Sequence, residues 1–305
     1  MRFYRFKTFT TSYYFPQLED NQQYMYGLYS PYGSRLSRLY WYLFRKCSII
    51  RALTSVNEDA LPFPYKEIMH ADETDSLMAF NMGSPGVEQK ISILGYDKQN
   101  GQPFFAKYSQ KERAVELTLH EAMIYQELEQ TGLTPKLLKF KKVGNGVYMK
   151  AEYLEGKRPD SKILDKKFVE IAMKLGNYHL SEIGRSTNNL KTCLSHGDFC
   201  PWNFLVNDGE YKLIDWEMAE ERPLGYDIFT FICNVSTLFY PHSSLKLAID
   251  ENRELICLYF SHFDIEDWLP YLKYYAKDKS EYEYKKGFKD RADQIKLLED
   301  YEINK

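Results

Sequence analysis

The sequence predicts an α+β fold of two lobes, in which a small antiparallel-sheet N-lobe precedes a larger helical C-lobe and an extra helical segment precedes both. Strand-like runs and glycine turns dominate residues 73–154, whereas helical periodicity dominates residues 155–305. A chain of 305 residues can bury a core without disulfides or metal sites. We therefore expect three parts: an N-terminal extension over residues 1–72, an N-lobe over 73–154, and a C-lobe over 155–305.

The extension contains a predicted basic amphipathic helix over residues 34–53. Apolar side chains recur there at helical spacing, at Leu36, Leu39, Tyr40, Leu43, Cys47 and Ile50. Basic side chains gather on a different face, at Arg35, Arg38, Arg45 and Lys46. No acidic residue occurs between Ser30 and Asn57. We interpret the segment as an extra helix packed on the core. The alternative is peripheral contact with an anionic membrane or glycan, with Trp41 and Tyr42 at the interface.

The N-lobe is predicted to hold five strands and one long helix. In chain order these are strands 76–82, 87–96 and 103–108, a helix over 112–129, and strands 137–143 and 146–154. The C-lobe is predicted to be mainly helical, with a helix over 166–183 and a tail whose segment 277–286 has the composition of a solvated helix face. A hairpin of residues 204–206 and 211–216 interrupts the helices around the turn Asn207-Asp208-Gly209.

The strongest functional signal is the segment His196-Gly-Asp-Phe-Cys-Pro-Trp-Asn203, which the predicted hairpin connects to Asp215. Phosphoryl transfer needs a carboxylate that orients and deprotonates the attacking hydroxyl, and it needs hard oxygen ligands for Mg²⁺. We assign the first role to Asp198, as catalytic base, and the second to Asn203 and Asp215. A hairpin returns the chain to its starting edge, so these residues are expected to lie close together.

This motif resembles the catalytic loop of the aminoglycoside phosphotransferase and choline kinase superfamily, which follows a His-x-Asp-x-x-x-x-Asn pattern with an Ile-Asp-Trp strand end downstream. The resemblance is close over Ser195 to Asp227 and extends over roughly residues 76–240. It implies a bilobal, protein-kinase-like fold, in which His196 braces the loop and Asp227 is structural. Protein kinases carry Arg at the position of Gly197 and Phe-Gly after the metal-binding Asp, so the small-molecule branch is favoured.

A lysine and a glutamate upstream fit the needs of a nucleotide. Lys107 lies in a strand-like run, where a lone Lys can hold the α- and β-phosphates, and the following helix offers Glu121 as its ion-pair partner. The superfamily has a strand Lys and a helix Glu of this kind. Glu116 or Glu112 could replace Glu121, which is favoured because a periodic apolar surface adjoins it.

Two further segments are candidates for nucleotide contact. Gly83, Ser84 and Gly86 form a turn between the first two predicted N-lobe strands, where backbone amides can approach phosphates, although a plain hairpin turn fits the composition equally well. Glu152 and Leu154 lie where the resemblance implies an interlobe hinge that reads the purine through backbone groups. Side chains there do not distinguish ATP from GTP.

The expected activity is transfer of the γ-phosphate of ATP, or alternatively GTP, to a hydroxyl of a small molecule or glycan, with Mg²⁺ as cofactor. Glu217, Glu220 and Glu221 follow the metal motif and would favour a cationic acceptor, whereas the basic N-terminal helix would favour an anionic one. The alternatives are a catalytically inactive nucleotide-binding regulator and a protein kinase. The missing Ala-Pro-Glu segment argues against a protein kinase.

The composition of the chain bears on whether it binds nucleic acid and on where in the cell it is expected. A net charge of −3 is unlike the broad excess of Lys and Arg with which proteins neutralise phosphates, so we expect no nucleic acid partner. The five cysteines are scattered without paired spacing. No run of about 18 apolar residues occurs, so the sequence predicts a cytoplasmic protein without a membrane span.

Overall fold

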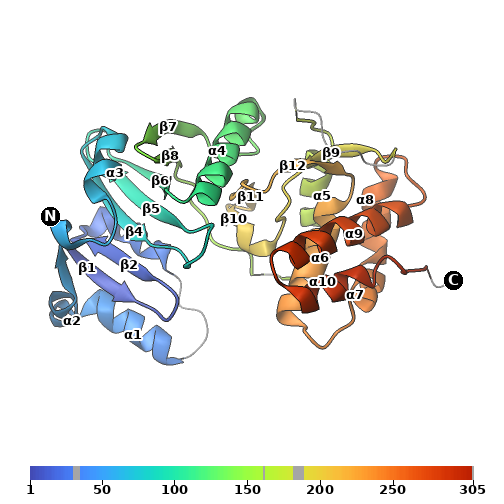
Figure 1. The fold of residues 1–305 in the computed structure, drawn as a ribbon, viewed down its shortest axis with the longest axis horizontal. Helices are drawn as coiled ribbons and strands as arrows, with labels where there is room; N and C mark the ends of the chain where they lie inside the picture. Colours follow the sequence, from blue (N-terminus) through green and yellow to red (C-terminus); the bar gives the residue numbers. More distant parts are fainter. Residues whose placement is uncertain (30–34, 161, 181–188, 304–305) are drawn as a thin grey trace. The chain divides into compact units, whose positions relative to one another are not determined.

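The computed structural model describes residues 1–29, 35–160, 162–180 and 189–303. The chain divides into two compact units, Met1–Leu154 and Glu155–Lys305, and each is described by itself. An antiparallel sheet of eight strands forms the centre of the first unit, and helices dominate the second (Figure 1). The predicted α+β fold class is therefore confirmed.

The first unit contains all eight strands of the large sheet. They are β1 (Arg2–Lys7), β2 (Ser12–Pro16), β3 (Ser55–Asn57), β4 (Ser76–Asn81), β5 (Lys90–Asp97), β6 (Gln102–Ser109), β7 (Leu137–Val143) and β8 (Gly146–Glu152), in the sheet order β3-β1-β2-β4-β5-β6-β8-β7. Its helices are η1 (Asp20–Leu28), α1 (Arg35–Lys46), α2 (Ser48–Leu53), η2 (Glu58–Ala60), α3 (Tyr65–Asp72), α4 (Glu112–Glu127) and η3 (Glu129–Thr131). The five strands and the helix predicted for the N-lobe are all present, with ends shifted by up to three residues.

Residues 1–72 do not form an extension outside the sheet. Strands β1, β2 and β3 belong to it, and Tyr14 of β2 pairs with Phe80 of β4 in antiparallel register. Aromatic side chains explain this, because Phe3, Tyr14 and Phe15 are almost fully buried and extend the core of the sheet sideways. The two units are consequently of nearly equal length, so the second is not the larger.

Helices cover both faces of the sheet. Successive residues of β4 point to opposite sides, so Met78 and Phe80 pack in a cluster with Ile68 of α3, whereas Leu77 and Ala79 pack in a second cluster that includes side chains of η1 and α1. The helix α1 therefore shields the end of the sheet that the strands near the N-terminus form (Figure 1).

The single helix predicted over residues 34–53 is two helices that break at Cys47, and Ser34 lies outside the described residues. Only part of the predicted apolar stripe packs: the ring of Tyr40 stacks on that of Phe6 at 4.9 Å and Ile50 contacts the same cluster. Trp41 and Phe44 are buried, with ring centroids 4.8 and 5.1 Å from that of Phe6. Two aromatic side chains three residues apart on one side fill the space beside the sheet, and the leucines of α1 stay exposed.

A buried ion pair joins the end of α3 to the sheet. The Asp72 carboxylate, which is fully buried, accepts hydrogen bonds of 2.8 Å from Lys150 and Tyr148 and of 2.7 Å from Ser76. Burial alone raises the pKa of Asp72, but the hydrogen bonds from Lys150, Ser76 and Thr74 outweigh it and lower the pKa from its ordinary 3.8. The negative charge of Asp72 therefore stabilises the folded state fully at pH values above 3.8. This stabilisation is lost as the pH falls from there through the lowered pKa.

Asp72→Asn is therefore expected to destabilise the protein by about 3 to 5 kcal/mol, because it leaves the buried Lys150 ammonium without its counter-charge. Urea denaturation at pH 7 measures this loss. The matched control is Asp59→Asn, which breaks a 2.9 Å pair with Lys66 whose two side chains are 75% and 77% exposed, and which should leave the midpoint unchanged. Equal midpoints for both variants would contradict the prediction.

The second unit consists of helices around two short antiparallel strand pairs. Its elements are α5 (Lys166–Leu175), β9 (Thr192–Ser195), η4 (Pro201–Asn203), β10 (Phe204–Asn207), β11 (Glu210–Leu213), β12 (Glu220–Pro223), α6 (Tyr226–Phe239), α7 (Leu245–Glu251), α8 (Arg253–Ser261), α9 (Leu269–Lys285) and α10 (Lys289–Lys296). The helix predicted over 166–183 ends at Leu175, and residues 181–183 lie outside the described part. The pairing of β9 with β12 was not predicted.

The segment 277–286 is not the solvated helix face that its composition indicates. Within α9, Lys279, Ser280 and Glu283 are buried. The mixture of Lys, Glu and Tyr in this segment gives no apolar pattern from which the buried side of α9 could be predicted. Long charged side chains can nevertheless be buried when they pair with other groups. Among the described residues, no helix is both long enough and apolar enough to cross a membrane. All five cysteines are described, and their thiols are free.

Candidate active site

The hairpin β10–β11 carries the chain back from the loop over residues 196–203, the predicted catalytic loop. Asp208 and Gly209 have φ of 49° and 80°, which fits the type I′ turn expected of Asp-Gly, and Asn207 pairs with Glu210. The sequence predicted Asp215 at the end of the second strand of the hairpin. Strand β11 ends at Leu213, so Asp215 lies two residues beyond it.

The backbone of Ile214 is held on both sides by the catalytic loop. Its N–H donates to the carbonyl oxygen of Asn203 at 3.0 Å, and its carbonyl oxygen lies 3.1 Å from Nε2 of His196. The next residue, Asp215, has a left-handed φ of 69°, which is uncommon for a residue other than glycine. Residues distant in sequence therefore place Asp215 beside the loop that carries Asp198 and Asn203.

His196 acts as a brace in this arrangement. Its Nδ1 accepts a hydrogen bond of 3.3 Å from the N–H of Asp198, so Nε2 is the nitrogen that carries the proton and donates to Ile214. The imidazole is fully buried, and its centroid lies 4.8 Å from the ring of Trp216. Both nitrogens are thus occupied by backbone groups, which fits a structural role rather than proton transfer.

Asp227, at the start of α6, holds the other side of the loop. Its carboxylate accepts hydrogen bonds from the Ser195 hydroxyl at 2.7 Å, the N–H of His196 at 2.8 Å and the N–H of Gly197 at 3.0 Å. Hydrogen bonds to a carboxylate are among the stronger ones in proteins. The buried Asp227 therefore fixes the three residues that precede Asp198.

Gly197 is required by both conformation and space. Its φ of 78° favours glycine, and a Cβ atom there would lie 2.2 Å from the carbonyl oxygen of Met218. The Gly in place of the Arg of protein kinases is therefore a structural feature of this loop.

The carboxylate of Asp198 is oriented by two amide side chains. Nδ2 of Asn203 donates to Oδ2 at 2.8 Å and also to the Asp198 carbonyl oxygen at 2.8 Å, and Nδ2 of Asn234 donates to Oδ1 at 3.3 Å. The Cys200 thiol lies 3.5 Å from Oδ1, and burial together with the Asp198 charge raises the pKa of that thiol, which stays neutral. Since the amide nitrogen of Asn203 is used, its oxygen is the atom that can bind a metal.

Sequence reasoning missed the support behind Asp198. Asn234, on α6, accepts a short hydrogen bond from Arg291 of α10, and Arg291 lies 3.5 Å from Glu283 of α9. Lys279 lies 3.4 Å from the same carboxylate oxygen, and burial lowers the pKa of this lysine although both Glu283 and Asp198 raise it. In the sequence, Asn234 could have been noticed as a polar residue within the largely apolar run that forms α6. Glu283 and Arg291 gave no such signal.

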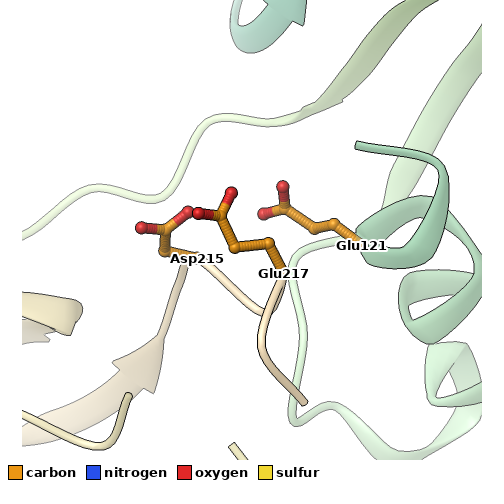
Figure 2. Close-up of side chains that lie close together, drawn as sticks. All are labelled: Glu121, Asp215 and Glu217. Carbon is orange, nitrogen blue, oxygen red and sulfur yellow. The ribbon is translucent and has the colours of Figure 1, made fainter. Parts of the chain in front are cut away.

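Two acidic side chains follow β11. Figure 2 shows Asp215 and Glu217 side by side on this segment, and a carboxylate oxygen of each lies within 4.8 Å of the other. Carboxylate oxygens are the ligands that Mg²⁺ prefers, usually with waters and phosphate oxygens. Glu217, which the sequence suggested only as part of an acceptor pocket, is thus a candidate ligand next to Asp215.

The first unit holds the predicted lysine and its partner. Nζ of Lys107, on β6, donates to both carboxylate oxygens of Glu121 at 2.8 and 2.6 Å, and the Tyr125 hydroxyl donates to the same carboxylate at 3.2 Å. Glu121 extends from α4 (Figure 2) and is fully buried. Of the alternatives, Glu116 pairs instead with Arg113.

The other predicted nucleotide contacts lie in the loop before β5 and at the end of β8, in the first unit. Gly83 has a left-handed φ of 65°, and its N–H donates to the Asn81 side chain at 3.0 Å; Ser84 and Gly86 follow before β5 begins. The carbonyl oxygen of Gly86 accepts a 2.6 Å hydrogen bond from Lys111. At the end of this unit, β8 ends at Glu152, and the boundary between the two units falls directly after Leu154.

Part of the second unit matches a known protein family. Residues 179–245 match the profile of the phosphotransferase enzyme family. No curated protein sequence matches the chain. The solved structures that resemble it include the ethanolamine kinase of Plasmodium vivax, 14% identical with a TM-score of 0.50 over 89% of this chain and 94% of that chain.

Two other solved structures are less similar in shape. The amicoumacin kinase hAmiN, in complex with AMP-PNP, Ca²⁺ and Ami, is 13% identical with a TM-score of 0.49 over 69% of this chain and 85% of that chain. An aminoglycoside phosphotransferase of Streptomyces rimosus is 12% identical with a TM-score of 0.45 over 77% of this chain and 97% of that chain. The resemblance to the aminoglycoside phosphotransferase and choline kinase superfamily is thus confirmed by the family match over the catalytic loop and by a kinase-like fold.

Proposed function

We propose that this protein transfers the γ-phosphate of ATP or GTP to a hydroxyl of a small molecule or glycan. The observation that carries the proposal is the loop in which Asp198 and Asn203 are hydrogen-bonded to each other while Ile214, held by His196 and Asn203, places Asp215 beside them. A carboxylate next to a set of hard oxygen ligands is the arrangement that phosphoryl transfer needs.

Asp198 is the proposed catalytic base. The acceptor oxygen forms a bond to the γ-phosphorus, the bond from that phosphorus to the β,γ-bridging oxygen breaks, and Asp198 takes the acceptor's proton while a nucleoside diphosphate leaves. The amides of Asn203 and Asn234 fix the direction in which the carboxylate faces.

The residues beside Asp198 fit a divalent cation. The amide oxygen of Asn203 and the carboxylates of Asp215 and Glu217 are hard oxygen donors, so we propose that they hold Mg²⁺. When bound, the metal would neutralise charge on the transferring phosphate. His196 and Asp227 would serve only to fix the loop.

Nucleotide binding is assigned to the first unit. Lys107, held by Glu121, is the proposed contact to the α- and β-phosphates. The turn with Gly83, Ser84 and Gly86 would offer backbone amides to phosphates, and the backbone near Glu152 and Leu154 would contact the base. Residues 155–305 would then carry catalysis and the acceptor site.

A panel of acceptors tests the proposal. Purified protein is incubated with ATP or GTP, Mg²⁺ and amino alcohols, sugars, aminoglycosides or a generic protein, and phosphorylated products are identified by mass spectrometry. We expect transfer to a small hydroxyl compound that disappears in Asp198→Asn.

The matched control is Asp208→Asn, a change of the same type in the exposed turn between β10 and β11, which should keep full activity. Nucleotide binding without transfer or hydrolysis would indicate a regulator. Transfer only to the generic protein would indicate a protein kinase. Either result would overturn the proposal.

A further inference from the structure

Helix α1 presents an apolar surface to solvent as well as to the sheet. Its inner face carries Trp41 and Phe44, whose exposed fractions are 6% and 0%. On its other sides, Leu36, Leu39 and Leu43 are 76%, 54% and 39% exposed. Packing on the sheet therefore buries Trp41 and Phe44 of α1 and leaves its leucines in contact with solvent.

The same surface continues on α2, where Ile49 and Leu53 are 69% and 82% exposed. Single exposed apolar side chains are common, but several on two consecutive helices indicate a surface that contacts something apolar. We call the exposed side chains of residues 35–53 the α1–α2 surface.

Basic side chains share the α1–α2 surface. In α1, Arg35, Arg38, Arg45 and Lys46 are all exposed. Residues seven apart lie two turns apart on nearly the same side of a helix, so Lys46 lies in line with Leu39. The described part of this surface, residues 35–53, contains no acidic side chain.

We propose that the α1–α2 surface binds an anionic lipid bilayer. Apolar side chains would enter the region between headgroups and acyl chains while the cations contact lipid phosphates or carboxylates. A soluble anionic glycan would satisfy the cations but would leave Leu36, Ile49 and Leu53 in water. A second copy of this chain would bring cations against cations. A bilayer with anionic headgroups matches both properties, and the inference does not depend on the proposed reaction.

Vesicle sedimentation with the full chain tests the inference. At low salt we expect binding to vesicles of phosphatidylserine and phosphatidylcholine, weakening as salt is added, and little binding to phosphatidylcholine alone. Replacing Arg35, Arg38, Arg45 and Lys46 by Gln should weaken binding about a hundredfold or more, since each cation near an anionic bilayer contributes about fivefold and the four factors multiply.

Two further variants separate charge from apolar contact. Leu36→Gln with Leu39→Gln should also weaken vesicle binding, with a loss that low salt does not restore. The matched charge control replaces four exposed lysines of α9 and α10 by Gln, at Lys273, Lys277, Lys285 and Lys296. This control should bind vesicles like the unmodified chain. Circular dichroism verifies that each variant is folded.

Three outcomes would overturn the inference. The first is unchanged vesicle binding in the variant without the four α1 cations. The second is an equal loss in the α9–α10 control, which would mean attraction by overall charge. The third is vesicle binding that is indifferent to the leucine changes together with tight binding to inorganic polyphosphate, which would indicate a soluble polyanion. Transfer to a soluble acceptor should be unchanged in all these variants, so failure of the proposed activity is recognised separately.

Discussion

Asp198→Asn is expected to lower turnover by about 10² to 10⁴-fold, the usual contribution of a general base, while nucleotide binding stays largely intact. The change removes the proton acceptor. It also directs an NH₂ group toward either Asn203 or Asn234, both of which donate to this carboxylate. Single-turnover measurements on the identified acceptor give the rate, and titration with nucleotide in the presence of Mg²⁺ gives the affinity.

Asn234→Ala provides the comparison that separates chemistry from orientation. It keeps the carboxylate and removes the 3.3 Å hydrogen bond to Oδ1 of Asp198, together with the hydrogen bonds that join Asn234 to Arg291 and to the Cys200 thiol. A hydrogen bond to a charged group is worth about 10- to 100-fold, so its loss of turnover should not exceed that range. If Asp198→Asn retained near-normal turnover, Asp198 would not be the base.

Asp215→Asn is expected to damage both binding and turnover. A neutral amide in place of the carboxylate weakens the hold on Mg²⁺ and so on the phosphates, in the ground state and the transition state alike. Asn tolerates the left-handed φ of 69° at this position, so the backbone should not change.

Nucleotide titrations with and without Mg²⁺ distinguish this role from a general loss of structure. Without Mg²⁺, Asp215→Asn and the unmodified protein should bind nucleotide equally, and with Mg²⁺ the variant should bind about tenfold or more weakly. Raised Mg²⁺ should restore part of the turnover. Equal affinities with Mg²⁺ would remove Asp215 from the proposed metal site.

The arrangement of the loop over residues 196–203 was predictable because the residues that fix it are close together in the sequence. His196 and Asn203 lie seven residues apart, and a short hairpin with a recognisable turn leads to Asp215. The pairing of Lys107 with Glu121 was also accessible, because a strand followed by a helix limits the partners to the glutamates of that helix. Local sequence patterns predict contacts well where the residues in contact are separated by only a short stretch of chain.

The support behind that loop was not predictable, because it comes from helices distant in sequence. Arg291 and Glu283 lie in segments whose composition indicates solvent exposure, and only the packing of α9 and α10 brings them to Asn234. The buried face of α1 was hidden for a related reason. Periodicity identifies an apolar stripe, but the aromatic pair Trp41 and Phe44 has the shape that fills the space beside Phe6.

Gly197 limits how this loop can change by substitution. A single codon change to Arg would create the His-Arg-Asp order of protein kinases, but any side chain here meets the Met218 carbonyl oxygen at 2.2 Å. The left-handed φ of 78° adds about 1 to 2 kcal/mol for a residue with a Cβ atom. Because Met218 lies on the chain just after Glu217, that substitution would displace the segment on which the proposed metal ligands lie. The His-Gly-Asp loop of this chain and the His-Arg-Asp loop of protein kinases therefore differ by a backbone rearrangement. Converting one into the other would require changes at Gly197 and at the Met218 segment together.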